Sequence, residues 1–233
     1  MSRVPRLLVP SLPAKGTLRL PEDEAAHLTR VLRARPGDVV RVFDGRGREA
    51  ECRVVEVSKA GAVVEVVRDV DAPRPARDVV LVTSVPRGAR MEWLVEKATE
   101  AGAAQVLPLA ARRSVRKEAG ANEVRRWRRS AAEAAKQCGR ATVPDVADPM
   151  PLADAIARTA GCTRLVGAPG ASATLRDALP EKGRVAIFVG PEGGFDAEEE
   201  AALAEAGAVR FGLGSLVLRV ETAAVVAVHT ASL

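Results

Sequence analysis

Residues 184–195 read RVAIFVGPEGGF, a short apolar run that ends in a glycine-rich turn. Residues 208–222 read AVRFGLGSLVLRVET and repeat this arrangement further along the chain. Short apolar runs bounded by turn residues are typical of parallel strands that are buried on both faces. Ligands bind outside the carboxyl ends of such strands, where glycine lets the backbone approach a ligand closely. We therefore expect an α/β fold in which the two segments form a ligand pocket.

Familiar nucleotide-binding fingerprints do not explain these glycines. A GxGxxG dinucleotide motif would need glycine at Val217, and the chain has no GKS or GKT phosphate loop. A dehydrogenase or a P-loop enzyme is therefore disfavoured. The glycines could instead serve ordinary turns, and that interpretation stays open for either segment taken alone.

Outward from these segments, residues 73–233 alternate apolar runs with helical patterns, as in an α/β domain. Further strands are expected from Val79, Ala104 and Thr163. Two helices with a buried stripe are expected over residues 91–102 and 122–138. The stripes consist of Met91, Leu94, Val95 and Ala98 in the first helix and of Val124, Trp127, Ala131 and Ala134 in the second. Gly102 is expected to cap the first helix in a left-handed conformation.

A proline-containing linker, DAPRPAR at residues 71–77, separates this region from the start of the chain. Before the linker, runs from Asp38, Arg48 and Gly61 alternate apolar and polar residues with period two. These runs predict a small antiparallel sheet in a compact barrel, interrupted by one helix from Pro21 to about Leu32. We place the domain boundary in the linker, which gives domains of residues 1–72 and 73–233.

Composition excludes several classes of protein. No apolar run approaches the ~18 residues that cross a bilayer, and the start MSRVPRLLVP is too short and interrupted for a signal peptide, so we expect a cytoplasmic protein. Cys52, Cys138 and Cys162 are odd in number and scattered, which suits reduced thiols that serve packing. Because the chain has no CxxC or HxxxH spacing, we expect no metal.

Positive charge is concentrated in the middle of the chain. Residues 73–140 carry 15 basic and 7 acidic side chains, against a net charge of +5 for the whole protein. Clustered arginine suits phosphate, because its planar guanidinium pairs bidentately with anionic oxygens. A nucleic-acid partner is therefore plausible, and a solvated arginine-rich helix face is the alternative.

Longer motifs resemble the bacterial RsmE family, whose members methylate N3 of a uridine in small-subunit (16S) ribosomal RNA. The likeness spans nearly the full chain. The matching motifs are RVPR (3–6), HLTRVLR (27–33), FDG (43–45), MEWLVEKATEAG (91–102), AAKQCGR (134–140), GPEGGF (190–195) and LRVET (218–222). The resemblance implies a SPOUT methyltransferase domain, with a parallel sheet and a C-terminal trefoil knot, after a PUA-like RNA-binding β-barrel. It also implies a homodimer and a reaction in which S-adenosylmethionine is converted to S-adenosylhomocysteine, without a metal.

The resemblance also assigns the site residues. The methyl donor is expected to bind at Val166, Gly167, Gly190, Pro191, Glu192, Gly193, Gly194, Leu213, Gly214, Leu216, Val217 and Leu218. One position departs from the family pattern LGxRxLR, since Leu216 stands where the family commonly has arginine. Our hypothesis is that Arg219 stabilises the developing uridinate, and that Glu221 accepts the proton or orients Arg219. The two side chains could instead form a structural ion pair at a helix start.

RNA contacts are expected from basic residues in both domains. These are Arg3, Arg6, Arg30 and Arg33 in the first domain and Arg112, Arg113 and Arg116 in the loop RRSVRK at residues 112–117. Trp93 and Trp127 are expected in the core and not as base-stacking platforms. Two other functions remain open: a SPOUT methyltransferase acting on another RNA position, and a non-catalytic RNA-binding factor in ribosome assembly.

Overall fold

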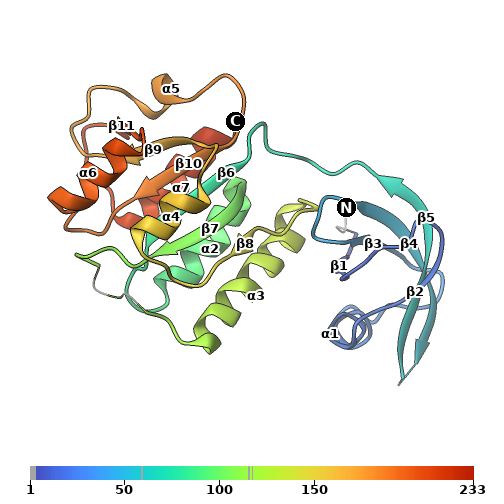
Figure 1. Ribbon diagram of the computed structural model, residues 1–233. Helices are drawn as coiled ribbons and strands as arrows, with labels where there is room; N and C mark the ends of the chain where they lie inside the picture. The colour runs from blue at the N-terminus through green and yellow to red at the C-terminus, as the bar shows by residue number, and fades with distance from the viewer. Residues whose placement is uncertain (1–3, 59, 115, 117) are drawn as a thin grey trace. The chain divides into compact units, whose positions relative to one another are not determined.

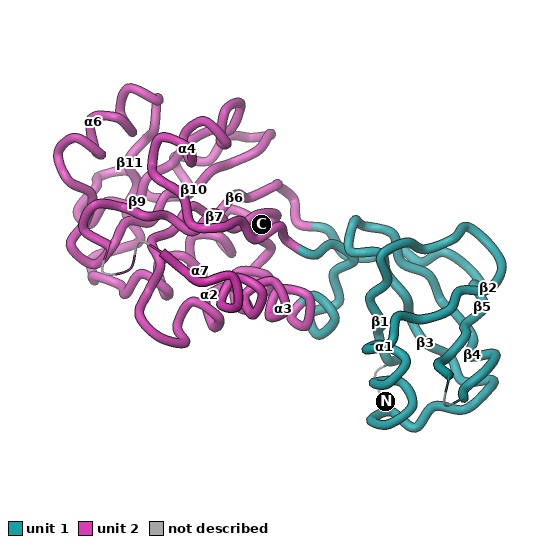
Figure 2. Tube along the Cα trace, turned by 60° about the horizontal axis from the view of Figure 1, so that its bottom comes forward, with its two compact units in different colours: residues 1–74, 135–143 teal, residues 75–134, 144–233 magenta. Residues whose placement is uncertain are grey.

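The computed structural model describes residues 4–58, 60–114, 116 and 118–233. The chain forms two compact units, which Figure 2 shows in different colours. Unit 1 comprises Met1–Arg74 and Ala135–Val143, and unit 2 comprises Pro75–Ala134 and Pro144–Leu233. The expected boundary between residues 72 and 73 lies two residues before the observed one, but the predicted second domain, residues 73–233, also included residues 135–143, which belong to unit 1.

Unit 1 is built on a five-stranded sheet with the strand order β1-β3-β4-β5-β2. Its elements are β1 (Arg6–Leu8), β2 (Gly16–Arg19), α1 (Glu22–Ala26), the π-helical turn η1 (His27–Val31), β3 (Val39–Phe43), β4 (Glu49–Ser58) and β5 (Gly61–Val70). The pairs β3–β4 and β4–β5 are antiparallel, as predicted, and β2, which was not predicted, also pairs antiparallel with β5. The pair β1–β3 is parallel, and β1 was not among the predicted strands. A parallel pair needs a long crossover, which β2 and α1 provide.

The core of unit 1 confirms the period-two patterns. Alternate residues Val40 and Val42 of β3 are at most 1% exposed, and Cys52 and Val54 of β4 are equally buried. Leu28 of η1 packs into the same cluster and is fully buried. One face of the sheet therefore carries the core, with the helical segment covering it.

Unit 2 is built on a six-stranded sheet with the order β11-β9-β10-β6-β7-β8, in which every strand pair is parallel. Its elements are β6 (Val79–Ser84), α2 (Arg90–Ala101), β7 (Ala103–Leu109), α3 (Ala121–Cys138, whose last residues lie in unit 1), β8 (Asp145–Val146), α4 (Leu152–Arg158), β9 (Thr163–Gly167), α5 (Leu175–Ala178), β10 (Val185–Val189), α6 (Ala197–Glu205), β11 (Val209–Phe211) and α7 (Val220–Ser232). Every residue of β6 and β10 is buried, as the apolar runs predicted. Figures 1 and 2 together show helices on both faces of the sheet, with α2 and α7 packed on one face and α4 and α6 on the other.

The helix stripes are confirmed, with one error. Met91, Leu94, Val95 and Ala98 are fully buried in α2, and Trp127 of α3 is 2% exposed. Trp93, however, is 44% exposed, so its placement in the core was wrong. Trp93 lies beside the buried stripe of α2 and not within it, because residues adjacent in sequence point about 100° apart around a helix.

The trefoil knot implied by the family resemblance stays a prediction. The structure does bring the segment after β11 alongside the segment after β9: the Gly212 amide donates a hydrogen bond of 2.9 Å to the Ala173 carbonyl. A Cβ atom at Gly212 would lie 3.1 Å from the Ala171 carbonyl oxygen. Only glycine fits this close passage without displacing the backbone.

In the part of the chain that the structure describes, no helix combines the length and the apolar character that crossing a membrane requires.

Candidate functional site

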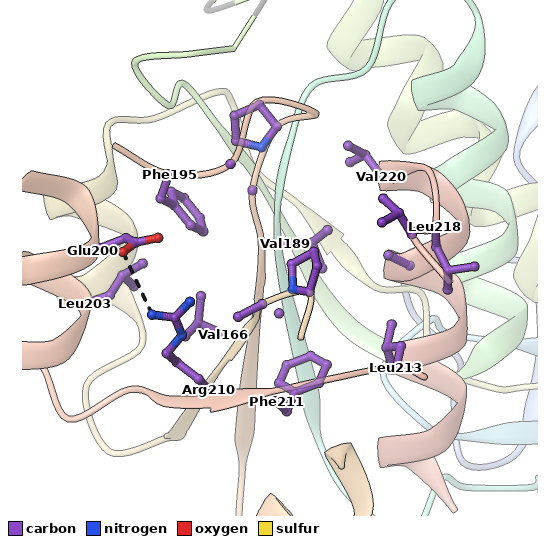
Figure 3. A pocket seen from close by; sticks show the side chains of 18 of the residues that line it. Val166, Val189, Phe195, Glu200, Leu203, Arg210, Phe211, Leu213, Leu218 and Val220 are labelled. Carbon is purple, nitrogen blue, oxygen red and sulfur yellow. Dashed lines mark ion pairs between the residues drawn. The ribbon is translucent and has the colours of Figure 1, made fainter. Parts of the chain in front are cut away.

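A cavity of about 730 Å³ lies at the carboxyl ends of β9, β10 and β11 in unit 2. Its lining comes from three chain segments that follow these strands, and from one face of α6. In Figure 3, Leu213, Leu218 and Val220 lie across the cavity from Val166 and Phe195. The two glycine-containing segments, residues 190–195 and 208–222, therefore meet in one cavity.

The first of them, residues 190–195, is called here the glycine loop. A hydrogen bond of 2.8 Å from the Gly194 amide to the Pro191 carbonyl closes it into a tight turn, with Gly194 at φ +70°. A Cβ atom at Gly190 would lie 3.1 Å from the ring of Phe195, so the loop packs its own aromatic ring against bare backbone. Glycine permits both features at no steric cost.

The helix α6 begins directly after the glycine loop. Asp196 is its N-cap, and the Asp196 carboxylate accepts a hydrogen bond of 2.8 Å from the Glu199 amide. This backbone hydrogen bond, together with the nearby Arg112, holds the pKa of Asp196 below its usual value. The Glu199 carboxylate in turn accepts a hydrogen bond of 3.0 Å from the Asp196 amide, which completes a capping box and fixes the end of the loop.

The second segment, residues 213–218, forms the opposite wall. Leu213 and Leu218 are half-buried, whereas Leu216 and Val217 are 79% and 81% exposed. The wall is therefore apolar on the inside and open at its tip.

The residues expected to bind the methyl donor are almost all brought together. The cavity is lined by Val166, Gly167, Gly190, Pro191, Glu192, Gly194, Leu213, Gly214, Leu216, Val217 and Leu218. Gly193 is the exception, because a Cβ atom there would face the side chain of Arg113, at 3.6 Å from its Cδ. Their role in binding a donor stays a prediction at this point.

Sequence reasoning missed the side of the cavity formed by α6 and β11. Glu200 of α6 and Arg210 of β11 line it, with an ion pair of 3.9 Å between Glu200 Oε2 and Arg210 Nη1 (Figure 3). The α6 residues that line the cavity are Ala197, Glu200, Ala201, Leu203 and Ala204. Four of them, Ala197, Glu200, Ala201 and Ala204, are spaced three and four residues apart as on one face of a helix, and this signal was present in the sequence.

The expected catalytic pair is placed at the start of α7. Arg219 is the N-cap of this helix, is exposed, and lines the cavity. Glu221 is 7% exposed, and its Oε1 lies 3.5 Å from Nη1 of Arg90. Among the described residues, Arg219 forms no ion pair with Glu221, and the buried Oε2 of Glu221 has no hydrogen-bond partner. A buried polar atom left unsatisfied in this way often marks a functional site.

Two of the arginines expected to bind RNA are free to do so. Arg30 in η1 and Arg33 just after it are both exposed. The two residues between them, Val31 and Leu32, are exposed as well. Arg3 lies outside the described residues.

The other expected RNA-binding arginines are engaged within the protein. Arg6 is buried and binds the Glu49 carboxylate through two hydrogen bonds of 2.9 and 3.0 Å. Arg116 binds Glu123 in the same bidentate way, at 2.7 and 2.9 Å. Arg112 pairs with Asp196, and Arg113 donates to the Gly193 carbonyl. Arg6 and Arg116, each held by both oxygens of a carboxylate, can bind a phosphate only by giving up that partner, whereas the exposed Arg113 binds the Gly193 carbonyl through its Nη1 only.

Cys52 is buried, and burial raises the pKa of its thiol to about 11. Over the described residues, no three or more His, Cys, Asp or Glu side chains gather as they would around a metal ion.

Comparison with known protein families first defines the class. The model of a family described as "RNA methyltransferase domain" matches residues 73–232, which include the whole cavity. A second model, "RNA methyltransferase PUA domain", matches residues 20–67 in unit 1. An RNA methyltransferase domain preceded by a PUA domain is thus the class that fold and site define.

Individual relatives then narrow the class. Ribosomal RNA small subunit methyltransferase E of Mycobacterium bovis is 37% identical, over 94% of this chain and 87% of the relative. The protein of that name from Bacillus subtilis is 31% identical, over 93% and 90%. A crystal structure of ribosomal RNA small subunit methyltransferase E from Neisseria gonorrhoeae, bound to S-adenosyl methionine, superposes with a TM-score of 0.90 at 29% identity, covering 98% and 96%. The chain belongs to the ribosomal RNA small subunit methyltransferase E family.

Proposed function

We propose that this protein transfers the methyl group of S-adenosylmethionine to N3 of a specific uridine in 16S ribosomal RNA. Membership of the family and the S-adenosyl methionine bound to the Neisseria relative support this reaction. The observation that carries the proposal is that the segments after β9, β10 and β11 line a single cavity. Had these segments lain apart, no site for the donor would exist.

The residues present fit S-adenosylmethionine. A cavity of about 730 Å³ is in the usual range for such ligands, roughly 300–1,000 Å³. Leu213 and Leu218 on one side, with Val166 and Phe211 on the other, offer apolar surfaces for the adenine ring (Figure 3). Main-chain groups of the glycine loop are open to the polar edges of the ligand, because glycine leaves the backbone uncovered.

The protein's contribution to the chemistry is chiefly positioning. The bound donor supplies a methyl group already activated by its sulfonium, so the uracil N3 must be aligned with it and lose its proton. Arg219 lies in the cavity wall, where its positive charge stabilises the negative charge that develops on the uracil.

Glu221 is the proton acceptor in this proposal. It follows the cavity-lining Val220, and its Oε2 is buried without a hydrogen-bond partner, whereas Oε1 is near Arg90. Arg90 is therefore the cation that orients Glu221, and this pairing favours the role of proton acceptor over the alternative considered from sequence, in which Glu221 orients Arg219.

RNA binding is assigned to unit 1. Arg30 and Arg33 supply positive charge, and the adjacent exposed Val31 and Leu32 supply apolar surface. Contacts of this kind position the RNA backbone, so binding should weaken steeply as salt concentration rises.

We also propose a homodimer acting in the cytoplasm, since a second copy would cover the exposed Leu216 and Val217. Sedimentation analysis tests the oligomeric state.

The reaction is tested by calorimetry with S-adenosylmethionine and by mass spectrometry of ribosomal RNA nucleosides. The protein should bind the donor, and cells that lack it should lose 3-methyluridine from 16S RNA. Loss of a different methylated nucleoside would indicate another RNA position. Failure to bind the donor would favour a non-catalytic assembly factor.

Arg219→Ala is the sharpest test of the catalytic assignment. We expect kcat to fall by on the order of 100-fold, because a charge aimed at the developing anion is lost. The Kd for the donor should stay within about twofold, since main-chain groups dominate donor binding. Arg184→Ala is the matched control, because this exposed arginine immediately precedes the amino end of β10, away from the cavity. Near-normal turnover of the Arg219→Ala variant would overturn the assignment.

A further inference from the structure

The turn that follows β7, residues 111–114, is called here the arginine turn. Two backbone hydrogen bonds fix this turn. The Ala110 amide, just before the turn, donates to the Met150 carbonyl at 2.8 Å, and within the turn the Ser114 amide donates to the Ala111 carbonyl at 3.0 Å. Arg116, just beyond the turn, forms a β-bridge with Val85 after β6. Since β6 lies between β7 and β10 in the sheet, the turn reaches over the end of β6 toward the glycine loop.

Glu199 makes the first connection between the turn and the loop. This side chain is buried, at 6% exposure, and both of its carboxylate oxygens are used. Oε1 accepts a hydrogen bond of 2.8 Å from the Arg112 amide, and Oε2 accepts one of 3.0 Å from the Asp196 amide. One buried carboxylate therefore ties the backbone of the arginine turn to the residue that ends the glycine loop.

Arg113 makes the second connection. Its Nη1 donates to the Gly193 carbonyl at 2.9 Å and lies 3.5 Å from the Phe195 carbonyl. The glycine loop thus has two faces: Gly190, Pro191 and Gly194 line the cavity, while Gly193 faces Arg113.

We propose that the arginine turn positions the glycine loop for donor binding, with Glu199 and Arg113 as its positioning residues. A loop with three glycines loses much conformational freedom when a ligand orders it. A loop that is already held in place on the side away from the cavity avoids this loss of conformational freedom. The arginine turn therefore raises the affinity for the donor without contacting the donor. The identity of the ligand rests on the function proposed above, whereas the bracing of the loop does not.

Glu199→Gln tests the proposal with almost no change in size. Glutamine has a single acceptor oxygen, so it cannot accept from both the Arg112 and the Asp196 amides. We expect the Kd for S-adenosylmethionine, measured by calorimetry, to rise about tenfold, as for the loss of a hydrogen bond to a charged group. Glu205→Gln is the matched control, because Glu205 is exposed at the far end of the same helix.

Steady-state kinetics separate positioning from general destabilisation. In the Glu199→Gln variant the KM for the donor should rise, while kcat at saturating donor and the KM for RNA stay within about twofold. A merely structural role would instead lower kcat and the fraction of active protein. Equal donor affinity in wild type and variant would overturn the proposal.

Variants of Arg113 provide a second test of the proposal. Arg113→Ala should weaken donor binding about fivefold, less than Glu199→Gln because the Arg113 side chain is exposed. Arg113→Lys keeps one charged donor and should recover part of this loss. Weaker RNA binding with unchanged donor affinity would overturn the proposal in favour of the RNA contact expected from sequence.

Hydrogen exchange of the ligand-free protein tests whether the arginine turn holds the glycine loop, and it needs no methyl donor. Amides of residues 192–196 should exchange faster in Glu199→Gln and Arg113→Ala than in the wild type or in Glu205→Gln. If the wild-type protein fails to bind S-adenosylmethionine, the proposed function is wrong, but the exchange rates still show whether the arginine turn holds the glycine loop. Unchanged exchange rates in both variants would overturn the proposal that it does.

Discussion

Some arginine side chains of this protein are held by a carboxylate or a backbone carbonyl, and others are left to solvent. Arg116 is held: its two Nη atoms bind the two oxygens of Glu123, and Glu123 also accepts from the Gly120 amide at the start of α3. The Arg116 hydrogen bonds, followed by that of Gly120, lower the pKa of Glu123 from 4.5 to about 2. Arg30 and Arg33 are exposed and remain available to RNA.

The Glu123 carboxylate gives a pH-dependent prediction. Because its pKa is lower in the folded than in the unfolded protein, its stabilisation is complete above about pH 4.5 and is lost as the pH falls toward 2. Glu123→Gln should therefore lower Tm at pH 6 and have no effect near pH 2. Thermal melts between these pH values, with the exposed Glu118→Gln as control, measure this. A Tm difference that persists undiminished at pH 2 would contradict it.

At the scale of elements, the ends of helices fix how α2 and α7 pack together. Gly102 ends α2 at φ +109°, in the left-handed conformation that the sequence predicted. Ser232 at the end of α7 donates to the Ala101 carbonyl at 2.7 Å. A Cβ atom at Gly102 would lie only 2.8 Å from Cβ of Ser232. Gly102 therefore serves both as a cap and as the contact point of two helices.

Gly102→Ala and Gly88→Ala separate these two roles. Gly88 also has positive φ, +64°, but no atom lies within 4 Å of its Cβ position. Gly88→Ala should cost about 1 kcal/mol of unfolding free energy, from backbone strain alone. Gly102→Ala should cost about 2–4 kcal/mol, because overpacking adds to the strain. Chemical denaturation measures both, and equal losses would show that the helix contact adapts.

At the scale of the whole molecule, the two units are not consecutive in sequence. Residues 135–143 belong to unit 1, although the chain on both sides of them belongs to unit 2. Arg6 holds them there: its guanidinium donates to the carbonyls of Ala135, Lys136 and Arg140 at 2.7–3.1 Å. The same guanidinium binds Glu49 and lies 4.5 Å from the centre of the Phe43 ring. One side chain thus joins three distant parts of unit 1.

Arg6→Ala should destabilise unit 1 severely. It would leave the Glu49 carboxylate, 5% exposed, without its cation, and removing one partner of a buried pair costs about 3–5 kcal/mol. Arg68→Ala is the control, since Arg68 is exposed and Glu51 keeps Arg41 as a second partner, so this loss should be at most about 1 kcal/mol. Denaturant unfolding measures both variants. The double variant Arg6→Met with Glu49→Leu should recover the part of the loss that comes from the unpaired Glu49 charge, whereas the part that comes from the three carbonyls should remain.

Local patterns predicted most elements because their cause is local. The period-two runs of β3, β4 and β5 and the stripes of α2 and α3 follow from side-chain geometry along one element. The parallel pairing of β1 with β3 could not be predicted, because no local signal records which distant strand a short segment joins. The exposure of Trp93 was missed because helical membership alone was taken to imply burial.

For the candidate site, the sequence by itself determined which segments meet: apolar runs ending in glycine place Gly190 and Leu213 at one edge of a parallel sheet. Only the tertiary structure decided that Gly193 faces away from the cavity, and that Arg6 and Arg113 bind partners 43 and 80 residues distant. The physical reason is that strand and helix periodicity arises between neighbours along the chain. The partner of a charged side chain depends on which distant segments the folded chain brings within hydrogen-bonding distance.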